Sequence, residues 1–169
     1  MFSRTPDTPE DVVADGRDET ADERADRNWI EVLQELRVVQ TGTQILAGFL
    51  LALAFQPTFG ELSDGQRIVY LALVVLAALS AVVALAPVSA HRALFGRRVK
   101  PSIVRFGNAC MVSALGLVSA LLVGVVAFVF DLVGGGAASW VAGAVLALVI
   151  VVLWVAAPVL IRRGAGRTS

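Results

Sequence analysis

The chain has 169 residues, 57% of them hydrophobic, and a formal net charge of zero. Soluble domains are about 45–50% apolar, and here the excess is gathered in four blocks, so the composition excludes an ordinary soluble domain. A single cysteine and a single histidine also exclude a disulfide framework and a structural zinc site, because both need several such ligands.

The N-terminal segment, residues 1–28, is predicted to be a disordered acidic tail on the cytoplasmic side. It carries nine acidic side chains and four arginines, with few large apolar groups. Such a segment cannot bury enough surface to offset its ordering entropy. Its acidic start also differs from a signal peptide. A solvated tail is the simpler interpretation, and binding to a basic partner is the alternative.

The stretch Trp29–Gln44 is predicted to be an amphipathic helix that extends the first membrane span toward the N-terminus. Polar side chains at spacings of three and four residues share one face, which we call the polar stripe: Gln34, Arg37, Thr41 and Gln44. In one interpretation this helix lies in the headgroup zone and its stripe is in water. In the other, Thr41 and Gln44 point into the bundle, where they make interhelical hydrogen bonds or line a polar cavity.

Two local pairings are expected near the ends of the first span. Glu31 follows Arg27 by four residues, which is the spacing of an ion pair along one helix. Ser63 and Gln66 have the spacing of a capping box that opens the second helix. Tyr70, just beyond, is expected to be an interfacial aromatic residue.

The four apolar blocks predict an all-α fold, an integral membrane four-helix bundle. A span needs about 20 residues, and the candidate spans are 41–56, 68–90, 109–130 and 138–161. The first apolar core is short, so its helix must borrow residues that precede it. The transmembrane domain is then 29–163, followed by a cytoplasmic tail at 164–169.

Basic residues set the orientation. They concentrate in the loop between the second and third spans and at the C-terminus, so the positive-inside rule places both termini in the cytoplasm. The loop cluster is also a candidate contact for anionic lipid headgroups; its members are Arg92, Arg97, Arg98, Lys100 and Arg105. Ordinary topology-setting charge is the simpler interpretation of that cluster.

Small residues recur every four positions in three spans and are candidate helix-packing rows, because they let helix backbones approach closely in lipid. The rows are Gly48 and Ala52; Gly116, Ala120 and Gly124; and Ser139, Gly143 and Ala147. We expect the third and fourth spans to form a tight antiparallel hairpin across their rows, and a spare row to serve association with a second copy.

The apolar cores of the spans hold no ionisable side chain, which weighs against proton-coupled exchange, since that needs a titrating group at mid-depth. The serines there, Ser80, Ser113 and Ser119, are expected to bond carbonyls of their own helices. His91, at the end of the second span, is expected to be an interfacial residue. No catalytic, cofactor or metal site and no nucleic-acid partner is expected.

Several short segments resemble a family of small, uncharacterised four-span bacterial membrane proteins of actinobacterial type, some of which are automatically labelled sodium:proton antiporters. The segments are Arg27-Asn28-Trp29, Leu33-Gln34-Glu35-Leu36-Arg37-Val38, Gln40-Thr41-Gly42 and Phe55-Gln56-Pro57. The resemblance covers about residues 27–163. It implies the four-span form and a location in a bacterial inner membrane, and it supplies no established activity.

The function expected is that of a non-enzymatic membrane protein, a packing, regulatory or partner-binding module. Its partners would be the lipid bilayer and either a second copy or another membrane protein. The alternative is a small transporter or channel, antiporter-like, whose polar path begins at the stripe of the first helix. A third and weaker hypothesis is lipid sensing by the basic loop.

Overall fold

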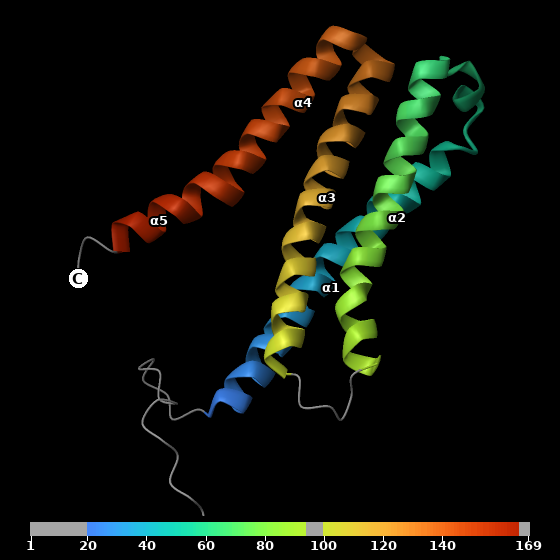
Figure 1. Cartoon of the computed structure of the whole chain (residues 1–169). Coiled ribbons are helices and arrows are strands. Elements are labelled where there is room, and N and C mark those ends of the chain that lie inside the picture. Colours follow the sequence, from blue (N-terminus) through green and yellow to red (C-terminus); the bar gives the residue numbers. More distant parts are fainter. Residues whose placement is uncertain (1–19, 94–99, 166–169) are drawn as a thin grey trace, which may run out of the picture.

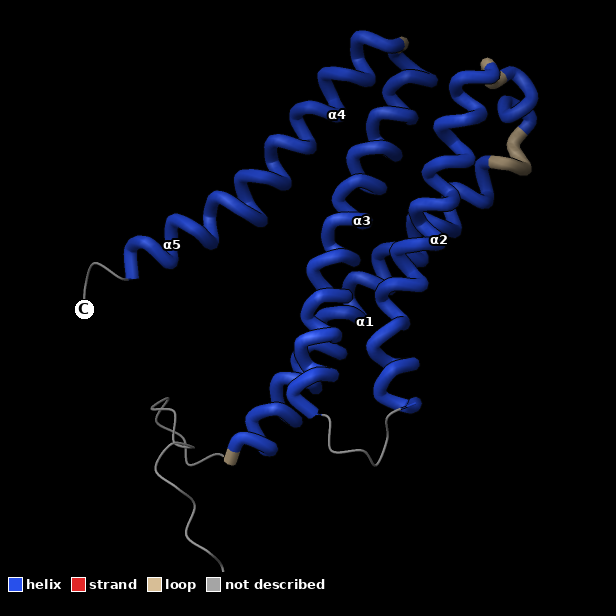
Figure 2. The backbone as a smooth tube through the Cα atoms, in the orientation of Figure 1, coloured by secondary structure: helices blue, strands red, loops and turns tan. Residues whose placement is uncertain are grey.

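The computed structural model describes residues 20–93 and 100–165 of the chain, and in these ranges it contains helices and short connections and no strand (Figure 2). Five α-helices, one 3₁₀ turn and one π turn follow one another: α1 (Ala21–Leu53), η2 (Pro57–Glu61), α2 (Asp64–Ala93), α3 (Lys100–Gly134), α4 (Gly136–Val151), η3 (Val152–Ala156) and α5 (Ala157–Ala165).

Four of these helical segments are long and apolar enough to cross a membrane, which makes the chain a multi-pass membrane protein. They are Asp26–Leu53, Asp64–Ala93, Ile103–Gly134 and Gly136–Arg163. The predicted fold class, an all-α four-helix membrane bundle, is confirmed. The first span-length helix begins well before the predicted residue 41, because the amphipathic extension and the span are one continuous helix.

The bundle consists of three closely packed helices and a fourth at its side. α1, α2 and α3 all contact one another, whereas α4 packs mainly against α3 and leans away from the others toward its C-terminal end (Figure 1). The start of α1 and the end of α5 lie toward the same end of the bundle (Figure 1). An even number of spans requires this arrangement.

Two clusters of buried side chains hold α1, α2 and α3 together. One lies near η2 and is formed by Leu50, Tyr70, Leu73, Ala77, Leu121 and Phe128. The other lies near the opposite end and is formed by Leu36, Ala84 and Ala114. Gly124 allows the close approach of α3 to α2, because a Cβ there would overlap Leu73.

α1 begins at Ala21, inside the predicted tail and eight residues before Trp29, where the helix was predicted to begin. Thr20 accepts a hydrogen bond from the Glu23 backbone N–H at 3.3 Å, and the Glu23 carboxylate accepts one from the Thr20 N–H at 2.9 Å. This reciprocal pair is a capping box, which satisfies N–H groups that a helix start leaves open. The first 19 residues, the remainder of the predicted tail, lie outside the described residues.

Tyr70 is buried, with 3% of its surface exposed, and is therefore not the interfacial residue that was expected. Its hydroxyl donates a hydrogen bond to the Leu50 carbonyl at 2.9 Å. At the end of α1 the Ala54 N–H donates to Leu51, three residues back, so the Leu50 carbonyl lacks its usual donor four residues on. Tyr70 supplies that donor and caps α1 from a neighbouring helix.

The fourth span is interrupted by the π turn η3, in which the Ala157 N–H donates to the Val152 carbonyl five residues back. Pro158 follows at once in α5. Proline has no N–H and its ring crowds the carbonyl four residues back, so a local widening of the helix precedes it. Pro87 lies inside α2 and is buried there.

Candidate functional site

The polar stripe of α1 faces away from the bundle. Gln34, Arg37, Thr41 and Gln44 are all exposed, while Leu36 and Thr43 between them are buried. The Thr41 hydroxyl donates to the Arg37 carbonyl of its own helix at 2.9 Å. The interpretation in which Thr41 and Gln44 point into the bundle is therefore wrong for a single chain. The neighbours of α1 contact its apolar side.

Thr43 is the polar residue of α1 that does lie inside the bundle, and it was not singled out in the sequence. It is 1% exposed, and its hydroxyl donates to the Val39 carbonyl at 2.9 Å. The serine prediction is confirmed for Ser80 and Ser119, which donate to Leu76 and Leu115 of their own helices at 2.8 and 2.7 Å. These hydroxyls are thus engaged by their own backbones.

The small-residue rows do not pair as expected. Gly143 of α4 does pack on α3, since a Cβ there would lie 3.4 Å from the Ala127 Cβ. The small-residue row of α3 was expected to contact α4 but does not: Gly124 faces α2, and Gly116 and Ala120 are exposed. The α1 row, Gly48 and Ala52, is also exposed, and it continues the face of the polar stripe. Ser139 and Ala147 are half-buried.

At the end of the bundle near the start of α1, Trp29 joins three helices. Its ring stacks on His91 of α2, with centroids 5.2 Å apart and planes at 26°. The ring also approaches α3 closely, because a Cβ at Gly107 would lie 3.0 Å from Trp29 Cζ3. His91, expected to be only an interfacial residue, therefore takes part in packing. Beyond it, Arg27 and Glu31 form the predicted ion pair at 3.2 Å.

The basic cluster is only partly described. Arg92 and Arg105 are exposed, and Arg105 borders a groove between α1 and α3 that Glu31 and Glu35 also line. Arg97 and Arg98 lie outside the described residues, and of Lys100 only the helical backbone is described. The lipid-contact hypothesis remains a prediction.

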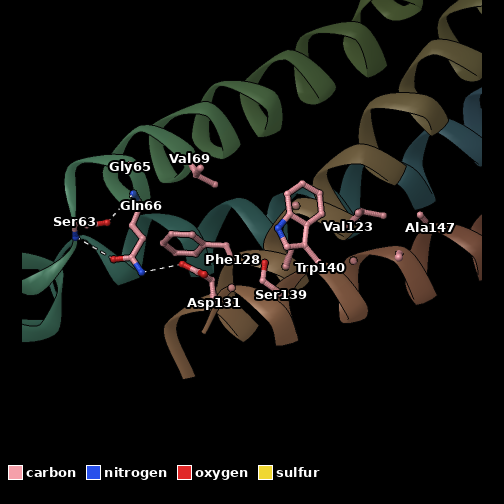
Figure 3. A pocket seen from close by; sticks show the side chains of 15 residues that line it. Ser63, Gly65, Gln66, Val69, Val123, Phe128, Asp131, Ser139, Trp140 and Ala147 are labelled. Atoms are coloured by element: carbon pink, nitrogen blue, oxygen red, sulfur yellow. Dashed lines mark hydrogen bonds between the residues drawn. The ribbon is translucent and has the colours of Figure 1, made fainter. Parts of the chain in front are cut away.

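A cleft of about 730 Å³ lies between α2, α3 and α4, near the turn that joins α3 to α4. Its walls are mostly apolar or small, for example Val69, Val123 and Ala147. Polar groups gather at one end, where Gln66 and Asp131 lie next to each other, with Val123 and Ala147 at the other end (Figure 3). No motif in the sequence marks this cleft, because its lining comes from three separate helices.

The polar end of the cleft is held by an ordered chain of hydrogen bonds. The Gln66 side chain donates from Nε2 to Asp131 Oδ2 at 2.9 Å. The Gln66 Oε1 accepts a hydrogen bond from the Ser63 backbone N–H at 3.0 Å. The Gln66 backbone N–H donates to Ser63 Oγ at 3.3 Å. The predicted capping box of α2 is thereby confirmed. It also orients Gln66 toward the carboxylate.

Among residues 20–93 and 100–165 there is no group of three or more His, Cys, Asp or Glu side chains suited to a metal ion. A model of a family of unknown function, DUF6328, matches residues 18–158. That range includes the polar stripe and the whole cleft, and its description names no activity. No curated protein and no solved structure matches the chain.

Proposed function

This chain belongs to DUF6328, a family of unknown function, and from that starting point we propose that it is a non-enzymatic membrane protein that acts by associating with other membrane helices through α1. The observation that carries the proposal is the exposed polar stripe within the span-length segment Asp26–Leu53. Polar side chains in lipid are costly unless they find partners, and in membrane proteins they commonly join helices.

A second copy of the chain is the partner that this surface fits best. Exposed positions on this surface follow one another at alternating spacings of three and four residues, which is the spacing of contact positions between two helices wound about each other. They are Gln34, Arg37, Thr41, Gln44 and Gly48. A carboxamide both donates and accepts hydrogen bonds, so two Gln44 side chains can pair across a two-fold axis. Gly48 and Ala52 have no bulk to hold the helices apart.

Arg37 fits the same arrangement because it lies 16 residues before Leu53, the end of α1, which is about 24 Å at 1.5 Å per residue and so near the opposite edge of a hydrocarbon layer about 30 Å thick. Its long side chain can extend to the headgroups while its methylenes stay in the apolar zone. We propose accordingly that both ends of the chain are cytoplasmic in a bacterial inner membrane. The basic residues at the end of α2, the start of α3 and the end of α5 support that orientation.

Cysteine crosslinking in native membranes tests the association. The only natural cysteine, Cys110, would be replaced by serine, and Gln44→Cys compared with Val75→Cys. Val75 is also exposed. It lies eleven residues after Asp64, the first residue of α2, which is at the same end of the bundle as the C-terminal end of α1. We expect several-fold more dimer from Gln44→Cys at every expression level. Equal crosslinking at the two positions would mean random collision and would refute the proposal.

The alternative is a small transporter or channel whose polar path begins at Arg37, Thr41 and Gln44. Since all three side chains are exposed, such a path would have to run between copies of the chain. Ion flux into proteoliposomes would separate the two functions. The transport function would be favoured if Gln44→Leu abolished the flux while a cysteine at another position of the polar stripe still crosslinked.

A further inference from the structure

The cleft between α2, α3 and α4 has the two properties of a site for an amphiphile. Binding pockets for small molecules are typically about 300–1,000 Å³, apolar over most of their lining, with a few placed polar groups. The cleft has a volume of about 730 Å³, and its polar groups are confined to one end. It lies between helices that face lipid, so an amphiphile can enter it sideways from the bilayer.

The polar end of the cleft carries the negative charge of Asp131, and no basic side chain is among the described residues that line the cleft. In the described part of the chain, Asp131 accepts a hydrogen bond from the neutral Gln66 amide and takes part in no ion pair. Its second oxygen, Oδ1, lies 3.9 Å from where a Cβ would sit on Gly136. The glycine at that position leaves the approach to Oδ1 open.

An aromatic side chain is placed to assist a cation. Trp140 of α4 lines the cleft and is 82% exposed, so one of its faces is available to a ligand. The indole ring is the aromatic side chain that attracts cations most strongly. Phe128, by contrast, is 3% exposed and packs with Tyr70, at 6.4 Å between ring centroids. Phe128 therefore closes the inner wall of the cleft.

We propose that this cleft binds a lipophilic organic ammonium ion, with its charged head between Asp131 and Trp140 and its alkyl tail along Val69, Val123 and Ala147. An anionic amphiphile would be repelled by the carboxylate. A zwitterionic phospholipid would bring a phosphate beside Asp131, which favours a single-tailed cation over a lipid headgroup. The site is independent of the α1 surface, which lies on another helix.

The test measures binding of dodecyltrimethylammonium to the full-length protein in lipid nanodiscs, with empty nanodiscs subtracted. The uncharged reference is dodecyldimethylamine oxide at mildly alkaline pH, which has the same tail. The central variant is Asp131→Asn, because asparagine can still accept the hydrogen bond from Gln66 and only the charge is removed. Asp64→Asn is the matched control, since Asp64 is an exposed acid at the same end of the bundle, outside the cleft.

We expect Asp131→Asn to weaken ammonium binding about tenfold, because a partly desolvated charge pair is lost, and to leave binding of the amine oxide unchanged. Asp64→Asn should bind both probes as the wild type does. Ala144→Trp, which fills the apolar part from α4, should abolish binding of both. The proposal is overturned if Asp131→Asn binds the ammonium as the wild type does, or if the two acid variants weaken binding equally. Equal affinity of the wild type for both probes would also overturn it.

Discussion

Replacing Tyr70 with phenylalanine removes one hydroxyl and nothing else. The ring keeps its edge-on contact with Phe59, whose centroid is 4.9 Å away, so no cavity opens in the cluster of buried side chains. What is lost is the hydrogen bond to the Leu50 carbonyl. Because Ala54 donates to Leu51 instead, that carbonyl is then left without a donor inside the bundle.

The size of the effect follows from the burial of both partners, since Leu50 is 4% and Tyr70 3% exposed. An orphaned buried carbonyl costs about 1–3 kcal/mol, and hydrogen bonds between membrane helices are worth about 1–2 kcal/mol in model peptides. We therefore expect Tyr70→Phe to lower the free energy of unfolding by about 1–2 kcal/mol, which multiplies the unfolded fraction about 5–30-fold.

The assay is reversible unfolding in mixed micelles of increasing sodium dodecyl sulfate content, followed by tryptophan fluorescence. Ser80→Ala is the matched control, because it also removes a buried hydroxyl bonded to a carbonyl, that of Leu76. Leu76 keeps its helical N–H donor, so Ser80→Ala should stay within about 0.5 kcal/mol of the wild type. If both variants lose the same stability, the Leu50 carbonyl was not orphaned and the argument for Tyr70 as a cap is refuted.

Three further outcomes follow from the packing and from the start of α1. Gly143→Leu should separate α4 from α3, seen as a longer spin-label distance between them, whereas Gly143→Ala should leave it unchanged because its Cβ would make an ordinary 3.4 Å contact. Trp29→Ala should cost about 3 kcal/mol in the same unfolding assay, since the ring stacked on His91 is lost; a cost near zero would show that the stack contributes nothing. The Thr20 backbone N–H and hydroxyl lower the pKa of Glu23 below its usual 4.5, so this cap is complete above that value and is lost as pH falls through the lowered pKa. The protection factors of the amide hydrogens in the first turn of α1, corrected for the intrinsic exchange rate at each pH, should then fall on acidification in the wild type and be low at all pH values in Glu23→Ala, which removes the carboxylate.

The features that the sequence predicted correctly depend on the spacing of residues within one segment and on the length of each apolar segment. Four helical spans, the Arg27–Glu31 ion pair and the Ser63–Gln66 capping box all follow from patterns within one segment. The capping box at Thr20 and Glu23 is of the same kind and could have been found in the same way. We instead interpreted the acidic composition of residues 1–28 as a disordered tail and did not use the spacing of Thr20 and Glu23.

The rotation of each helix about its axis could not be predicted. In a soluble protein the apolar face turns inward, but lipid is as apolar as the interior of a bundle, so hydrophobicity does not mark the inner face. Thr41 and Thr43 illustrate this, because they are two residues apart and only Thr43 is buried. The same difficulty affected the glycine rows: in α3, Gly116 is exposed and Gly124 meets α2.

The cleft was missed for a different reason. Asp131 and Gln66 are 65 residues apart in the chain, and their pairing depends on how α3 docks against α2. The sequence did show Asp131 as an acidic residue at the end of a span. The docking of the two helices places both side chains at the polar end of the cleft (Figure 3).

The length of α1 has a mechanical consequence. Its 33 residues form one unbroken helix, roughly 50 Å long at 1.5 Å per residue, against a hydrocarbon thickness of about 30 Å. α1 crosses the other helices obliquely (Figure 1), and its apolar part is the C-terminal one, so the length that exceeds the hydrocarbon thickness extends beyond the membrane at the polar N-terminal end. Trp29 contacts His91 of α2 and approaches Gly107 of α3 close to that end. These contacts therefore fix the direction in which the start of α1 leaves the bundle.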